Sequence, residues 1–141
     1  MYSDKNLIHI FTILEAIEKI FLYTSQFEDD EAFYYAQDQL YFNAVVNLLI
    51  AVGEETKKID EQIKGDFTFK WNEIAKMRDK ISHNYRGISP YVVWDIVIHA
   101  LQGYKELLRR IAPQVNEFEE ALRDALASDF YKHLVYLQNY K

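Results

Sequence analysis

The chain has 141 residues, of which half are hydrophobic, 16% are aromatic and none is cysteine. This length and apolar content fit a single folded domain over residues 1–141 and exclude a disordered chain, while the lack of cysteine excludes disulfides and thiolate metal sites. The net charge of −6 argues against a general nucleic-acid coat protein. We find neither a signal-peptide pattern nor a run of roughly 20 apolar residues, so we expect a cytoplasmic protein without a membrane span.

Apolar residues recur at helical spacing along most of the chain, and only four glycines and two prolines interrupt them. The spacing predicts a first helix over residues 4–26 and a long second helix over 31–63. The acidic run 28–31 separates the two and suits the positive end of the second helix. Gly53 is the position at which we expect the second helix to bend.

A third helix is predicted over residues 70–85. Its apolar stripe contains Trp71, Ile74, Ile81 and Tyr85. This is also the helix in which the residues of greatest chemical interest lie.

The pair Ser89 and Pro90 predicts the start of a fourth helix over 90–111, because a serine side chain caps a helix and proline is tolerated at the first helical position. Pro113 follows this helix, and a last helix is predicted over 114–138. No alternating strand pattern competes with the helices. Short connections favour antiparallel neighbours, so the predicted fold is all-α, an up-and-down antiparallel bundle of four core helices plus a C-terminal helix.

The basic residues are concentrated in one segment. Residues 57–86 hold eight Lys/Arg against five Asp/Glu, a balance of +3, whereas the remainder of the chain has a balance of −9. A solvated helix face would explain such a segment without any function. However, the segment also contains Arg78, His83 and Tyr85 within eight residues. An arginine holds phosphate, and a histidine transfers protons near neutral pH.

A helical wheel places Arg78 inside the apolar stripe of the third helix. A buried charge there needs a partner, unless the edge of the stripe faces a cleft or a second subunit where an anion binds. His83 lies on the polar flank, four residues after Asp79, which can orient the imidazole. A joint site therefore needs either an unwound last turn, which Asn84 and Gly87 would permit, or a two-fold dimer in which both copies contribute.

Two histidines and two arginines across a dimer axis would supply the base, the acid and the cations that metal-independent RNA cleavage requires. In such a groove Lys76, Lys80 and Arg86 would hold the RNA backbone by charge alone, and Tyr85 and Tyr91 could stack on unpaired bases. Tyr85 is also suited to accept a nucleotide, since nearby cations stabilise a phenolate. A capping or surface histidine and a core tyrosine are the structural alternatives.

Metal chemistry has weak support in the sequence. Asp95 and His99 are four residues apart, as are Asp129 and His133, and both pairs are more simply explained as local salt bridges. A zinc site would need a third ligand that we do not find. We therefore predict neither a metal nor a cofactor.

The sequence R-D-K-I-S-H-N-Y at 78–85 resembles the Arg-x4-His-x-Tyr motif of the HepT-like branch of the HEPN superfamily. The flanking W-N-E-I-A-K-M and R-G-I-S-P-Y-V-V-W are similar to that branch as well, and A-V-G-E-E-T at 51–56, which includes Glu54, is similar to its Gly-Glu segment. The resemblance covers about residues 7–112. The extension at 114–141 lies beyond it.

The resemblance implies a helical bundle that forms a two-fold homodimer, and a toxin of the HepT/MntA-type, or type VII, toxin–antitoxin systems. It implies a metal-independent endoribonuclease acting on RNA such as tRNA or mRNA, with Arg78 and His83 as the catalytic pair, supported by Asp79, Asn84 and Glu54. It also implies that an MntA-type nucleotidyltransferase antitoxin silences the toxin by AMPylation of the motif tyrosine, here Tyr85. The alternative is a non-catalytic substrate-binding or modified subunit of a nucleotidyltransferase complex.

Overall fold

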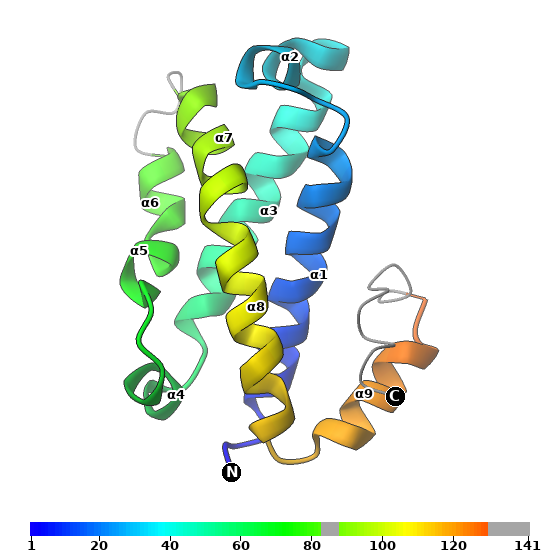
Figure 1. The fold of residues 1–141 in the computed structure, drawn as a ribbon, viewed down its shortest axis with the longest axis vertical. Helices are drawn as coiled ribbons and strands as arrows, with labels where there is room; N and C mark the ends of the chain where they lie inside the picture. The colour runs from blue at the N-terminus through cyan, green and yellow to red at the C-terminus, as the bar shows by residue number, and fades with distance from the viewer. Residues whose placement is uncertain (83–87, 130–141) are drawn as a thin grey trace.

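A computed structural model describes residues 1–82 and 88–129, and in these two ranges every regular element is a helix (Figure 1). In chain order the elements are α1 (Asn6–Thr24), α2 (Asp30–Tyr35), η1 (Ala36–Gln39), α3 (Leu40–Lys57), α4 (Glu61–Asp66), α5 (Trp71–Ala75), α6 (Met77–Ser82), α7 (Pro90–His99), α8 (Leu101–Ile111), η2 (Ala112–Gln114) and α9 (Phe118–Ala127). The predicted all-α bundle is therefore confirmed.

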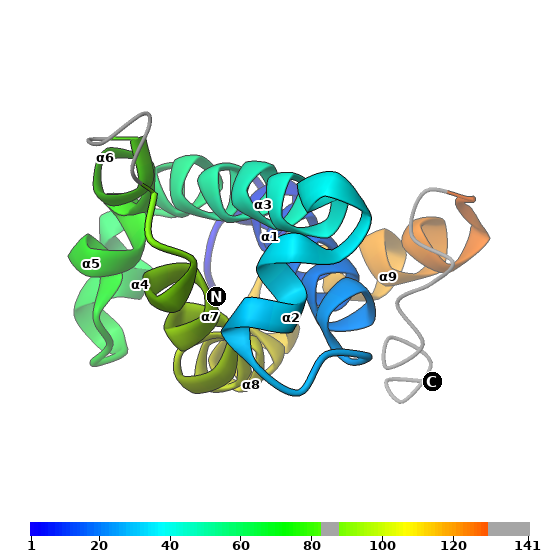
Figure 2. The ribbon, with the colours of Figure 1, turned by 90° about the horizontal axis from the view of Figure 1, so that it is seen from above.

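The helices form two layers when the bundle is seen from above (Figure 2). Helices α1 and α3 lie side by side in one layer, and α7 and α8 form the other. Helices α5 and α6 pack on the outer flank of α3, whereas α9 lies on the opposite side of the molecule, beyond α1. In the part of the chain that the structure describes, no helix is both long and apolar enough to cross a lipid bilayer.

Helix α1 is the centre of the hydrophobic core and corresponds to the first predicted helix. Its side chains Ile10, Ile13, Leu14, Ile17 and Ile20 are completely buried. Each such side chain contributes about 1.5–3 kcal/mol relative to an exposed one, so this helix alone supplies much of the driving force for folding.

The prediction of one helix over 31–63 is wrong. The chain turns between α2 and α3, where residues 37–39 all adopt left-handed φ angles between 49° and 71°. Each costs about 1–2 kcal/mol in a non-glycine residue. Aromatic packing offsets this cost, because the turn lets α2 place the fully buried Phe33 against the core. The ring centre of Phe33 lies 5.7 Å from that of Phe42 and 5.4 Å from that of Trp94.

Gly53 does not bend α3, contrary to our prediction, and the helix continues to Lys57. The glycine instead allows a close approach between helices. A β-carbon at Gly53 would lie 3.0 Å from the carbonyl oxygen of Ile74 and 3.2 Å from the β-carbon of Met77. The absence of a side chain therefore lets α5 and α6 pack tightly on α3.

Two further predicted helices are interrupted. The helix predicted over 70–85 breaks at Lys76, whose φ of −87° and ψ of 10° separate α5 from α6. The helix predicted over 90–111 breaks at Ala100, with φ −108° and ψ −38°, between α7 and α8. Apolar residues continue across both breaks, which is why their spacing did not reveal them.

The predicted start of the fourth helix is confirmed. Ser89 caps α7 by accepting a hydrogen bond from the backbone N–H of Val92, and Pro90 occupies the first helical position. The last predicted helix, over 114–138, starts later than predicted and is interrupted within the described residues. Helix α9 begins after Glu117, which has a left-handed φ of 67°, and ends before Ser128, whose backbone is extended.

Candidate functional site

The motif predicted to carry the chemistry begins on α6. This helix ends at Ser82, and the predicted residues His83, Asn84, Tyr85 and Arg86 lie outside the described residues. The described part of the motif points to the end of the bundle at which α7 begins and α2 lies (Figure 1).

Arg78 is exposed, so the alternative of a buried charge is wrong, and the edge of the apolar stripe is accessible to solvent at this position. Met77 and Ile81, four residues apart, face the core with 3% exposure each, whereas Arg78, the residue after Met77, is exposed. The guanidinium is therefore held on an anchored helix at a solvent-accessible surface.

The surface of α6 and of the residue before it is locally basic. Lys76, Arg78 and Lys80 are all exposed, and Asp79 is the one acidic side chain among residues 76–80. A protein with a net charge of −6 thus carries a local excess of positive charge at the start of its motif. Such an excess raises the local concentration of an anionic ligand even when the whole molecule is acidic.

Glu54, predicted to support the site, is half-buried on α3, and its carboxylate bonds the Nζ of Lys57 at 3.0 Å. Among the described contacts of the segment 51–56, those that reach the motif helices are packing contacts. Gly53 sits against α5 and α6, as described above. This segment therefore positions α5 and α6 through packing on the side that faces α3.

A buried hydroxyl pair fixes the start of α5. The Oη of Tyr104 lies 2.6 Å from the Oγ1 of Thr56, which in turn donates to the carbonyl of Val52 at 2.7 Å. The ring of Tyr104 stacks on Phe69 with centroids 5.0 Å apart and meets Trp71 edge-on at 5.9 Å. Burial raises the pKa of Tyr104, so its hydroxyl stays a neutral structural donor.

Sequence analysis missed a polar contact between α1 and α3. The Nδ1 of His9 lies 2.6 Å from a carboxylate oxygen of Glu55, and Lys58 bonds the other oxygen at 3.2 Å. Burial alone would raise the pKa of Glu55, but the hydrogen bonds with His9 and Lys58 outweigh it and lower that pKa. Because 46 residues separate the partners, no local pattern signals this contact.

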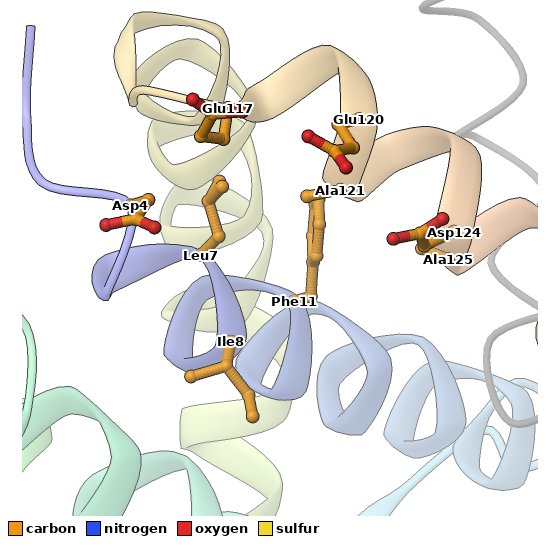
Figure 3. A pocket seen from close by; sticks show the side chains of 9 residues that line it. All are labelled: Asp4, Leu7, Ile8, Phe11, Glu117, Glu120, Ala121, Asp124 and Ala125. Atoms are coloured by element: carbon orange, nitrogen blue, oxygen red, sulfur yellow. The ribbon is translucent and has the colours of Figure 1, made fainter.

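The structure also contains a groove of about 650 Å³ between α1 and α9 (Figure 3). Four carboxylates and an apolar floor line it: Asp4, Leu7, Ile8, Phe11, Glu117, Glu120, Ala121, Asp124 and Ala125. The lining contains no lysine or arginine, so the groove would repel a phosphate. Despite its size, it is unsuited to hold RNA, and it lies on the flank of the bundle opposite α6.

Residues 1–82 and 88–129 contain no group of three or more His, Asp or Glu side chains arranged to hold a metal ion. Asp95 and His99 form the predicted local pair on α7, with 3.8 Å between the Oδ1 and Nε2 atoms. The second predicted pair involves His133, which lies outside the described residues.

The fold and the site define a small helical-bundle protein that displays a cationic motif at one end. The model of the family described as Ribonuclease HepT-like matches residues 13–111, and the chain belongs to this family. A relative from Thermococcus cleftensis named "Probable ribonuclease HepT" is 36% identical over 104 residues, which cover 70% of this chain and 90% of the relative. A protein from Methanocaldococcus jannaschii, whose name proposes an RNase, is 28% identical over 85% of this chain and 89% of its own length. No solved structure matches the chain at a significant level.

Proposed function

We propose that this protein is a metal-independent endoribonuclease of the HEPN type and the toxin component of a type VII toxin–antitoxin system. Its family and the names of its relatives support an RNase-type activity. The observation that carries the proposal is the exposed Arg78 on α6, a helix anchored by the buried Met77 and Ile81. In the sequence Arg78 stands five residues before His83, which is the spacing of the Arg-x4-His motif.

The proposed reaction is an internal transesterification. One His83 imidazole removes the proton of the RNA 2′-hydroxyl, whose oxygen then attacks the adjacent phosphorus. The bond from phosphorus to the 5′-oxygen breaks, and a second, protonated His83 imidazole donates a proton to that oxygen. The products are a 2′,3′-cyclic phosphate and a 5′-hydroxyl. Arg78 stabilises the charge that develops on the phosphoryl oxygens.

This chemistry requires a homodimer in our proposal. One copy supplies one His83, whereas the reaction uses a base and an acid at the same time. A two-fold axis beside α6 brings the motif of each copy to one groove. Lys76 and Lys80 would then hold the backbone of an RNA such as tRNA or mRNA through its phosphates.

Cleavage of labelled, unpaired RNA in the presence of EDTA tests the proposal. We expect the wild-type protein to form cyclic-phosphate ends, and His83→Ala to lower the rate by about 10²–10⁴-fold. Arg78→Ala should lower it as well, whereas the matched variant Arg110→Ala should not, because Arg110 is exposed on α8 at the other end of the bundle. Wild-type protein that leaves a broad panel of RNAs intact would refute the nuclease.

We further propose that an MntA-type nucleotidyltransferase antitoxin silences the protein at Tyr85. The phenol oxygen attacks the α-phosphorus of ATP, the bond between the α-phosphorus and the bridging oxygen breaks, and pyrophosphate leaves while the phenol proton passes to solvent. The AMP added to Tyr85 would block the groove beside Arg78.

Mass spectrometry after incubation with the partner and ATP tests the modification. We expect the mass of AMP on the wild-type chain and on Tyr91→Phe, a control with an exposed tyrosine on α7, but not on Tyr85→Phe. A mass gain together with no RNase activity in the unmodified protein would instead show a non-catalytic, modified subunit of a nucleotidyltransferase complex.

A further inference from the structure

A small cavity of about 190 Å³ lies in the seam between α5–α6 and α7. Its lining combines four apolar side chains with five polar ones: Lys70, Glu73, Ile74, Met77, Lys80, Asp95, Ile96, His99 and Ala100. A volume of this size corresponds to about six water molecules, which is the scale of one planar heterocycle.

The two helix breaks that sequence analysis missed both lie at this cavity. Ala100, where α7 ends, lines the cavity directly. On the facing side, the break at Lys76 falls between the lining residues Ile74 and Met77. Two uninterrupted helices would pack along a continuous seam, whereas two broken ones at the same level leave a hollow between them.

The chemistry of the lining selects the class of ligand. A phosphate group alone is disfavoured, because the lining includes two acidic residues, Glu73 and Asp95, as well as Lys70 and Lys80. A purely apolar ligand is disfavoured by the same polar rim. A nucleobase satisfies both parts, since its faces suit an apolar floor and its edge carries donors and acceptors together.

The cavity also lies beside the proposed reaction centre. Met77 and Lys80 line it, and Arg78 stands between them on α6 with its side chain at the surface. Arg78 and the two lining residues thus belong to one turn of α6.

We infer that this cavity binds one nucleobase of the cleaved RNA and prefers a base with an exocyclic amino group over uracil. Asp95 accepts the amino N–H, Lys70 donates to a ring or carbonyl acceptor, and Ile74 and Ile96 contact the ring face. This inference rests on the proposed nuclease function and adds sequence preference to it.

Sequencing of the 5′-hydroxyl ends from a randomised, unpaired RNA pool tests the inference. We expect wild-type protein to cleave beside cytosine, adenine or guanine about tenfold more often than beside uracil. Asp95→Asn replaces the two acceptor oxygens of the carboxylate with an amide and should reduce this preference severalfold. The matched control Asp124→Asn changes an exposed residue of α9 and should retain the preference. Cleavage without a base preference, or a preference unchanged in Asp95→Asn, would overturn the inference.

A binding measurement separates this inference from the nuclease proposal. Titration of isotope-labelled protein with CMP should shift the backbone NMR signals of Ile74, Ile96 and Ala100, while UMP should shift them much less. RNA that stays intact together with these CMP-specific shifts would refute the nuclease and retain the base site. Equal shifts with both nucleotides, or none with either, would overturn the base site whatever the RNA assay shows.

Discussion

The close contact at Gly53 makes a prediction in which two identical substitutions have opposite effects. Gly53 and Gly103 both lie in helices, where replacing glycine by alanine ordinarily stabilises by about 1 kcal/mol. A β-carbon at Gly103 would have no atom within 4 Å apart from its chain neighbours and the backbone of its own helix, so Gly103→Ala should show this gain.

At Gly53 the same methyl group would lie 3.0 Å from the backbone oxygen of Ile74 and 3.2 Å from the β-carbon of Met77. Backbone atoms cannot rotate away, so α5 and α6 must move, and such overpacking costs about 1–3 kcal/mol. After the gain in helix propensity, Gly53→Ala should be destabilised by up to about 2 kcal/mol.

Urea denaturation followed by far-UV circular dichroism measures the difference. We expect Gly103→Ala to exceed Gly53→Ala in free energy of unfolding by about 1–3 kcal/mol, with similar m-values. Because the displaced helix carries Arg78, RNase activity should fall in Gly53→Ala and not in Gly103→Ala. If Gly53→Ala were as stable as Gly103→Ala, our account of the packing between α3 and α5–α6 would be wrong.

Three further predictions concern polar contacts. Thr56→Val leaves the buried hydroxyl of Tyr104 without its partner and should lower the free energy of unfolding by about 1–3 kcal/mol, whereas Tyr104→Phe should lower it by about 1 kcal/mol. A double-mutant cycle measured by urea denaturation checks this pair, and we expect the two effects to be non-additive. The pKa of Glu55 is lowered in the folded protein, so the ionised carboxylate stabilises the fold at pH values above its ordinary pKa of 4.5, and this contribution is lost as the pH falls through the lowered pKa. Glu55→Gln should therefore flatten the pH dependence of Tm in that acidic range. An unchanged slope would contradict the contact with His9. Asn6→Ala removes two part-buried hydrogen bonds that tie α1 to Asp60, the residue before α4, and a third to the carbonyl of Ser3. It should cost about 2 kcal/mol in the same urea assay.

The limits of sequence analysis are clearest in the break at Lys76. The side chains of Ile74, Met77 and Ile81 have a spacing that a continuous helix also accommodates, so the pattern alone contains no sign of an interruption. The pattern equally does not reveal that Arg78 is exposed beside the buried Met77. That outcome depends on how α5 and α6 pack on α3, which involves Gly53, more than twenty residues earlier.

The sequence by itself determined those features of the protein that depend on local interactions. The 3.6-residue periodicity established the all-α class, and the Ser89 cap with Pro90 established a helix start, because both act between residues a few positions apart. The tertiary structure alone decided the left-handed turn at 37–39, the contact of His9 with Glu55 and the cavity between α6 and α7. Each of these is unfavourable or absent in the isolated segment, and only contacts with distant parts of the chain stabilise it.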